Sequence, residues 1–306
     1  QRWLSAEEDL DDFNDELRAL GAQMFGELFP FELQTVLWKH RDAIDSIQVI
    51  STEPFVPWEL VFLKDPAQPG LPEDGAFLAE KGLVRWLHGS WFPQEIRVRN
   101  GRARYVIPEY PVAADRLPEA QQEKAFLEQR FGATPVEPQP KAVRQLLKEP
   151  GSFDLLHFAC HGEAETHNIT FASLVMQGRV ENGQAIPAFL GATTVAEHSR
   201  LTAPDGNRPM VVLNACQAGR LGFHLTKIGG FAQAFLQGGA GAFVGTLWSV
   251  ADAPARSFTE ALYAALDAGD TLAEATRKAR AKARYEDASW LAYAVYGHPH
   301  ATWVRH

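Results

Sequence analysis

The chain has 306 residues, a formal net charge of −9 at pH 7 and only two cysteines. The negative charge argues against a general nucleic-acid-binding protein, whose affinity comes from a basic surface that neutralises phosphates. Two cysteines exclude a disulfide framework and favour a reducing, cytoplasmic compartment, and no run of residues reaches the roughly 18 apolar positions of a membrane span.

The first part of the chain, residues 1–112, predicts a smaller N-terminal lobe of two helices followed by short strands. Apolar residues spaced three and four apart predict an amphipathic helix over about 8–27, and Pro30 suits the first turn of a second helix. Prolines and glycines predict a loop over 64–75. The other predicted elements of this lobe are short and apolar, at 44–50, 58–63, 84–87 and 104–108.

Residues 113–306 alternate strands with helices and predict a second lobe, which also contains the candidate catalytic residues described below. Three runs, 155–159, 210–213 and 242–247, are almost continuously apolar, as in strands that helices cover on both faces. The pattern predicts an α/β sandwich with a mostly parallel central sheet. Residues 178–208 predict a long surface connection that could be clipped or reordered during activation. The predicted helices are 117–131, 141–148, 228–236, 255–266 and 272–284, and a last strand covers 292–296.

Reactive side chains follow two of these apolar strands. The first strand ends in the sequence CHGE (160–163) and the second in CQAG (216–219). Sites in open α/β sheets gather at the carboxyl ends of the strands, so His161 and Cys216 would face each other if the strands are parallel neighbours. A histidine beside a thiol raises its thiolate fraction and later protonates the leaving amine. The pair therefore predicts nucleophilic thiol catalysis.

Cys216, and not Cys160, is the predicted nucleophile. Cys160 is adjacent to His161, and successive side chains on a strand point to opposite faces. The backbone N–H groups of Gly162 and Cys216 are the predicted oxyanion donors, because such donors must point at the atom where negative charge develops. Gly162 is also expected to let the backbone turn sharply after the histidine.

Several alternatives stay open at this stage. A free cysteine at the end of an apolar strand is commonly a small core residue, which is the structural interpretation of Cys216. A Cys–His pair does not strictly need a third group, and the sequence does not choose between Asp154 and Glu163 as a partner for His161. The glycine-rich stretch 238–241 follows a helix and precedes a strand, so it predicts a helix end and not a phosphate-binding loop.

A metal site is not expected, and the predicted chemistry needs no cofactor. The four residues that could ligate zinc lack the paired spacing of zinc ligands. They are Cys160, His161, His167 and Cys216.

The surroundings of the pair resemble the CHAT domain of the caspase-like cysteine peptidase clan, which includes caspases, gingipains and separase. The sequences DLLHFACHG (154–162) and NACQAG (214–219) are similar to those of CHAT proteins. The sequence motif that surrounds the cysteine in caspases is absent. A histidine about 50 residues upstream of the cysteine is also the caspase spacing. Further similar stretches, in the same order, are VPWEL (56–60), LPEA (117–120) with Glu123, GTLWSVAD (245–252) and GHP (297–299).

The resemblance implies a caspase-like α/β/α sandwich and a cysteine endopeptidase that cleaves protein substrates through Cys216 and His161. It also implies control by an upstream sensor or helical-repeat region, a role in bacterial defence and gasdermin-like targets. No membrane and no nucleic acid are expected to bind this chain itself. Because the sequence starts at Gln1, domains upstream of it are expected.

Asp252 and Trp248 are the predicted substrate-pocket residues. Arginine-specific members of the clan place a carboxylate in the pocket for the residue before the scissile bond, and Asp252 aligns with such a residue of separase. A buried carboxylate would bind arginine bidentately. The alternative for Asp252 is an acidic residue favoured by the dipole of a helix that begins near Pro254. The alternative for Trp248 is a core aromatic.

Two other classes of function fit the same residues. A catalytically silent interaction or signalling module on a caspase-like scaffold would be indifferent to Cys216→Ala. A different thiol enzyme, such as an acyltransferase, would react at Cys216 and leave proteins intact.

Overall fold

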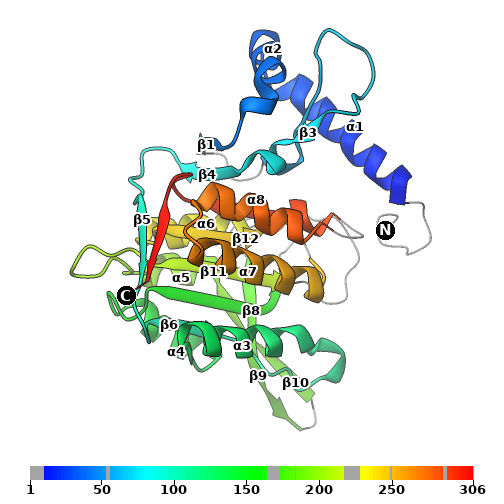
Figure 1. Cartoon of the computed structure of the whole chain (residues 1–306). Coiled ribbons are helices and arrows are strands. Elements are labelled where there is room, and N and C mark those ends of the chain that lie inside the picture. The colour runs from blue at the N-terminus through cyan, green and yellow to red at the C-terminus, as the bar shows by residue number, and fades with distance from the viewer. Residues whose placement is uncertain are drawn as a thin grey trace.

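The computed structural model of the chain describes residues 10–52, 56–163, 172–182, 184–216, 228–248, 250–284 and 288–305. A ten-stranded, mostly parallel sheet lies between two layers of helices (Figure 1). This architecture confirms the predicted α/β sandwich. Along the sheet the strands run in the order β1-β4-β13-β12-β11-β8-β6-β7, and the β9–β10 hairpin joins it through β8.

The strands of the sheet include the apolar runs predicted at 155–159, 210–213 and 242–247, whereas the short run at 58–63 forms a 3₁₀ turn and a strand outside this sheet. They are β1 (Ile47–Ser51), β4 (Leu83–Leu87), β6 (Ala103–Val106), β7 (Thr134–Pro135), β8 (Leu155–Glu163), β9 (Ser173–Glu181), β10 (Gln184–Gly191), β11 (Met210–Cys216), β12 (Ala242–Thr246) and β13 (Tyr293–Tyr296). Two smaller sheets pair β2 (Phe62–Leu63) with β3 (Ala76–Phe77), and β5 (Glu95–Val98) with β14 (Thr302–Arg305).

Except for the helix at 192–198, which lies in the predicted surface connection, the described helices agree with the predicted ones to within a few residues. They are α1 (Leu10–Leu28), α2 (Phe31–His40), α3 (Pro118–Phe131), α4 (Pro140–Leu147), α5 (Ala192–His198), α6 (Ile228–Gln237), α7 (Asp252–Asp267) and α8 (Leu272–Lys282). Both α3 and α4 begin at a proline, which lacks the N–H that a first turn leaves unpaired. None of the helices in these described residues is long and apolar enough to cross a membrane.

Alternation along β8 shows how the two helical layers cover the sheet. His157 bonds to residues of α3 and α7, on one face. The next residue, Phe158, lies with its ring centroid 6.1 Å from that of Phe235 in α6, on the other face. Successive side chains of a strand point to opposite faces, so both faces of β8 are buried. The continuous apolar runs of the central strands follow from this double burial.

The predicted surface connection over 178–208 is wrong. The segment contains most of a β-hairpin, β9 with β10, and then helix α5. Asn182 at the hairpin tip has φ 51, and Asn-Gly at 182–183 between alternating apolar residues is a strong hairpin signal that the prediction overlooked. The prediction for 238–241 is confirmed, because α6 ends at Gln237 and Gly239 adopts φ 109 before β12 begins.

Strands from both sides of residue 112 share the central sheet. β1, β4 and β6 come from the first part of the chain, and β6 lies directly beside β8. α1 and α2 lie at one end of the molecule (Figure 1). The division into lobes at 1–112 and 113–306 stays a prediction.

Asp154 lies just before β8, at the opposite end of the sheet from the predicted site, and both oxygens of its side chain accept hydrogen bonds. Its side chain is buried, and both carboxylate oxygens accept hydrogen bonds from Arg99, with a further one from Asn207 at 2.9 Å. Burial by itself would raise the pKa of Asp154. The hydrogen bonds and charge of Arg99, with the bond from Asn207, outweigh burial and hold this pKa below its ordinary value.

We expect Asp154→Asn to lower the free energy of unfolding by about 2 kcal/mol at pH 7, because a charge-assisted bond to Arg99 is lost. A carboxylate with a depressed folded-state pKa stabilises above its ordinary pKa of about 3.9, and the stabilisation disappears as the pH falls through the folded-state pKa. In urea unfolding from pH 7 to pH 3, the difference in free energy of unfolding between the wild type and Asp154→Asn should therefore decrease. A difference that stays constant with pH would contradict this linkage. As a control, Asp205→Asn removes an exposed partner of the same arginine and should change stability less.

Candidate active site

The two predicted catalytic positions meet at the carboxyl ends of neighbouring parallel strands. β8 and β11 pair in parallel from Leu155 with Met210 to His161 with Cys216. The expectation that these strands are parallel neighbours is therefore confirmed, and adjacent strands lie about 4.8 Å apart. The backbone of Cys216 is described, but its side chain lies outside the described part of the structure.

The ring of His161 is buried and held in one orientation. Only 7% of the residue is exposed, and Nε2 is 2.6 Å from the backbone oxygen of Asp115. A carbonyl oxygen only accepts, so Nε2 must carry the proton in this contact. In the neutral ring, Nδ1 is then the basic nitrogen. The contact thus selects the tautomer in which Nδ1 can accept a proton from a nucleophile.

Tyr110 is a second support of His161, which the sequence analysis did not identify. The two rings stack with centroids 4.6 Å apart and an interplanar angle of 30°. The backbone N–H of His161 donates to the Tyr110 hydroxyl at 2.9 Å, and that hydroxyl donates to the backbone oxygen of Val175 in β9 at 2.8 Å. Tyr110 therefore ties the histidine to the hairpin. Its position in a connecting segment carries no local signal of this role.

A backbone oxygen contacts Nε2 of His161, where the sequence analysis had left Asp154 and Glu163 open as partners. Asp154 lies seven positions before His161 on an extended strand, about 23 Å away, so this candidate is wrong. The side chain of Glu163 is outside the described part of the chain. The Asp115 carbonyl, at the end of the short 3₁₀ turn Ala113–Asp115, occupies the place instead.

Gly162 continues the strand instead of ending it. β8 extends to Glu163, and Gly162 pairs with Leu174 of the antiparallel neighbour β9. The sharp turn expected directly after the histidine is therefore wrong. A Cβ at this position would meet only ordinary contacts, the nearest being the Ala215 Cβ at 3.5 Å. Whether the Gly162 N–H can donate a hydrogen bond to an oxyanion depends on the direction in which this N–H points.

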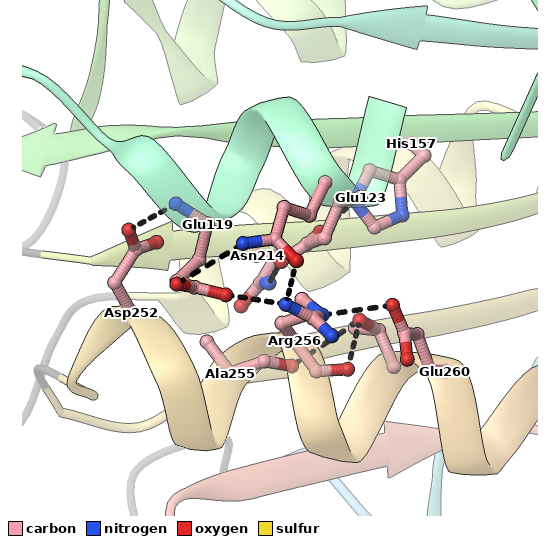
Figure 2. A network of polar contacts seen from close by, with 10 residues as sticks. Glu119, Glu123, His157, Asn214, Asp252, Ala255, Arg256 and Glu260 are labelled. Atoms are coloured by element: carbon pink, nitrogen blue, oxygen red, sulfur yellow. Dashed lines mark hydrogen bonds and ion pairs between the residues drawn. The ribbon is translucent and has the colours of Figure 1, made fainter. Parts of the chain in front are cut away.

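Asp252 and Trp248 follow β12, the strand on the far side of β11. Trp248 is only 6% exposed and packs in the main hydrophobic core. Asp252 is the first residue of α7 and is partly buried, and its Oδ2 accepts the backbone N–H of Glu119 at 2.8 Å (Figure 2). The carboxylate thus caps α3 from a neighbouring helix. The roles of both residues in a substrate pocket stay predictions.

The charge environment of Asp252 is mixed. Burial raises its pKa most, and the nearby carboxylates of Glu123 and Glu119 raise it further. The hydrogen bond from the Glu119 N–H and the charge of His161 act in the opposite direction, but the net shift is upward.

A buried polar network lies one layer beneath the strand ends. Glu123 of α3 accepts from Asn214 of β11 at 2.8 Å and bonds His157 of β8 at 2.7 Å (Figure 2). His157 also bonds Tyr263 at 2.9 Å, and Tyr293 donates to Asn214 at 3.0 Å. Buried polar groups are costly without partners, so this network fixes α3 against the two strands that carry His161 and Cys216.

Cys160 has the properties of an inert core residue. It is fully buried, and burial raises the pKa of its thiol well above the ordinary value. The thiolate is the nucleophilic form, so a buried thiol with a raised pKa is unreactive at neutral pH.

Comparison with known proteins places this arrangement in a family. The family model of the CHAT domain matches residues 55–303. Gingipain R (RGPB), described as an Arg-specific cysteine proteinase, matches with a TM-score of 0.52 and 12% identity over 98% of this chain and 80% of its own. The complex of the Porphyromonas gingivalis RgpB pro- and mature domains matches with a TM-score of 0.51 and 12% identity, over 98% of this chain and 78% of that one.

A separase also aligns, over a small part of its length. In the Saccharomyces cerevisiae separase–securin complex, the match has a TM-score of 0.48 and 17% identity over 84% of this chain. This chain spans 16% of that one. No curated protein sequence matches. The gingipain matches show a shared caspase-like fold, which confirms the predicted fold class, and the family match covers most of the chain. The chain therefore belongs to the CHAT domain family.

Proposed function

We propose that this chain is a cysteine endopeptidase in which Cys216 is the nucleophile and His161 transfers the proton. The observation that carries the proposal is the register of β8 and β11, which puts these two residues opposite each other at the carboxyl ends of parallel strands. Such ends are where sites of open α/β sheets form. The Asp115 oxygen on Nε2 supports the proposal, because it favours Nδ1 as the base.

The direction of the β8 backbone supports Gly162 as an oxyanion donor. The N–H of His161 donates to Tyr110, which bonds Val175 of β9, on the edge of β8 away from β11. Successive N–H groups of a strand point to opposite edges. The Gly162 N–H is therefore directed toward β11 and the backbone position of Cys216. We propose the Cys216 N–H as the second donor. An oxyanion between the two would take the place of the ladder bonds that the pairing of His161 with Cys216 implies for these N–H groups.

The proposed reaction runs through a thioester. His161 takes the proton of the Cys216 thiol, and the thiolate attacks the peptide carbonyl carbon. The C–N bond breaks as the histidinium gives its proton to the leaving amine. Water then attacks the thioester and gives a proton to His161, and the C–S bond breaks to release the acid and the thiolate. No cofactor takes part in these steps.

The finer parts of the proposal rest on family likeness. Control by an upstream sensor or helical-repeat partner, bacterial defence, gasdermin-like protein targets and a cytoplasmic location are proposed on this basis. An arginine before the scissile bond is proposed by analogy with the Arg-specific gingipain, with Asp252 as the carboxylate that would bind it.

The test is cleavage of a diverse peptide library by the wild-type chain and by Cys216→Ala, together with labelling by a thiol-directed peptidyl inhibitor. We expect cleavage and labelling by the wild type and neither by the variant. Cys160→Ala is the matched control, because it removes the other, buried cysteine. It should cleave and label like the wild type.

The other outcomes separate the alternatives. Labelling at Cys216 without cleavage of any peptide would indicate a different thiol enzyme, such as an acyltransferase. Neither labelling nor cleavage would overturn the peptidase and favour the catalytically silent interaction module. Cleavage that persists in Cys216→Ala would place the nucleophile elsewhere.

A further inference from the structure

We propose that Asp252 is a positioning residue, which acts through the first turn of α3 to hold the Asp115 carbonyl against the ring of His161. The inference rests on the proposed function, since it concerns the group that orients the proposed proton carrier. It differs from a pocket role, in which the carboxylate would bind the substrate directly.

The connection between the two contacts is short. The Asp115 oxygen meets Nε2 of His161 at 2.6 Å, and four residues later the Glu119 N–H donates to Oδ2 of Asp252 at 2.8 Å. Between them, Arg116 N–H bonds back to Ala113 in the 3₁₀ turn, and Pro118 begins α3 with its φ fixed by the ring. We expect a link of three residues, constrained in this way, to pass a displacement of the Glu119 end on to the Asp115 carbonyl.

A second contact from α7 holds the same residue. Arg256, one turn after Asp252, bonds the Glu119 carboxylate through Nη1 at 2.6 Å (Figure 2). The guanidinium is itself held by Glu260 at 2.9 Å and by Gln122. Both the backbone and the side chain of Glu119 are therefore bound to α7. Two residues of one helix thus fix the first turn of α3, which begins three residues after the orienting carbonyl of Asp115.

The environment of Asp252 suits this role better than a pocket. Oδ2 already accepts the Glu119 N–H, so a substrate arginine that paired bidentately with Asp252 would have to share this oxygen with the first turn of α3. The other carboxylates nearby, Glu119 and Glu123, raise its pKa, and Asp252 is partly buried. To cap a helix N-terminus, a side chain needs only an oxygen that accepts a hydrogen bond from a backbone N–H. It does not need a full negative charge.

The same helix pair offers a matched control at its other end. α3 and α7 run in the same direction, and Asp267 at the end of α7 bonds Arg130 in the last turn of α3 at 2.7 Å. Asp267→Ala therefore loosens the same two helices far from His161. A general loosening of the helix pair and a specific effect on the Asp115 carbonyl can be separated in this way.

The experiment compares Asp252→Ala, Asp252→Asn and Asp267→Ala in the whole chain. Asparagine keeps an acceptor for the Glu119 N–H and alanine does not. We expect Asp252→Ala to lower kcat about tenfold for every cleaved peptide with little change in KM, since one hydrogen bond is lost. Asp252→Asn should restore kcat to within about threefold of the wild type, and Asp267→Ala should leave it unchanged.

A second readout does not depend on turnover. Two-bond ¹H–¹⁵N correlation spectra report the tautomer of each histidine, and the His161 signals can be assigned with a His161→Gln variant. The Nε2–H tautomer should persist in the wild type, Asp252→Asn and Asp267→Ala, and become mixed in Asp252→Ala. Should Asp252→Ala fail to fold, Arg256→Ala loosens the same turn and takes its place.

The outcomes are distinct. A loss confined to arginine peptides in Asp252→Asn would overturn positioning and establish the pocket. Equal kcat and tautomer in Asp252→Ala and Asp267→Ala would also overturn it. If even the wild type cleaves nothing, the peptidase proposal fails. A tautomer that still changes only in Asp252→Ala would then uphold the positioning contact by itself.

Discussion

Glu59→Gln is expected to lower the free energy of unfolding by about 3–5 kcal/mol, because it leaves two buried guanidinium groups without an anion. Glu59 is fully buried, and its carboxylate binds Arg85 through Nε at 2.9 Å and through Nη2. Arg280 approaches the same carboxylate at 3.7 Å and also donates to three backbone oxygens. The cluster ties the turn before β2 to β4 and α8.

The pKa values of the two arginines show what the carboxylate does. Burial would lower the pKa of Arg85, but the charge and hydrogen bonds of Glu59 and Tyr296 outweigh it, and the net shift is upward. For Arg280 burial dominates and lowers the pKa to about 10, against the charge of Glu59 and with the repulsion of Arg85. Without Glu59, Arg280 would face burial with no nearby anion, and Arg85 would keep only its contact with Tyr296.

Urea unfolding of the wild type, Glu59→Gln and Glu181→Gln at pH 7 measures the effect. Glu181 pairs with Arg179 on the exposed hairpin, with side chains 52% and 69% exposed. Its replacement should change the free energy of unfolding by less than about 1 kcal/mol. A loss below about 1 kcal/mol for Glu59→Gln as well would show that water or a rearrangement compensates the arginines.

His161→Ala is expected to lower kcat/KM about 10³-fold, since the variant has neither a base for the Cys216 thiol nor an acid for the leaving amine. The measurement uses a peptide that the library experiment identifies as cleaved. A thermal unfolding curve must accompany it, because the substitution also removes the ring that stacks on Tyr110 and bonds Asp115.

His198→Ala serves as the control for His161→Ala. His198 lies at the end of α5, where its Nδ1 is 2.9 Å from the Thr194 oxygen and 3.9 Å from the Glu197 carboxylate. It should keep wild-type kcat/KM. If His161→Ala loses less than about tenfold while it remains folded, His161 is not the proton carrier and the proposed mechanism is wrong.

Two acidic residues in the stretches that resemble the family have structural roles in the buried polar contacts described above. Glu59 is the acid of the stretch VPWEL, and Glu123 follows LPEA in α3. Both carboxylates are buried and bonded within the fold, Glu59 to Arg85 and Glu123 to His157 and Asn214. Their place in the motifs therefore has a structural reason, and catalysis need not be invoked for it.

The sequence by itself determined the type of sheet and the place of the candidate pair. Strands buried on both faces must be apolar almost throughout, and this leaves a local pattern at 155–159, 210–213 and 242–247. The carboxyl ends of parallel strands meet at one edge, so His161 and Cys216 could be placed together before any contact was known. The hairpin of β9 and β10 was also readable from Asn182 and its neighbours.

Only the tertiary structure decided how the pair is supported. The oxygen that orients His161 belongs to the backbone of Asp115, and every residue has such an oxygen, so no side-chain pattern could select it. Tyr110 and Asp252 act across gaps of 51 and 133 residues, to His161 and Glu119. Contacts of that range depend on how helices and strands pack, and local periodicity carries no information about them.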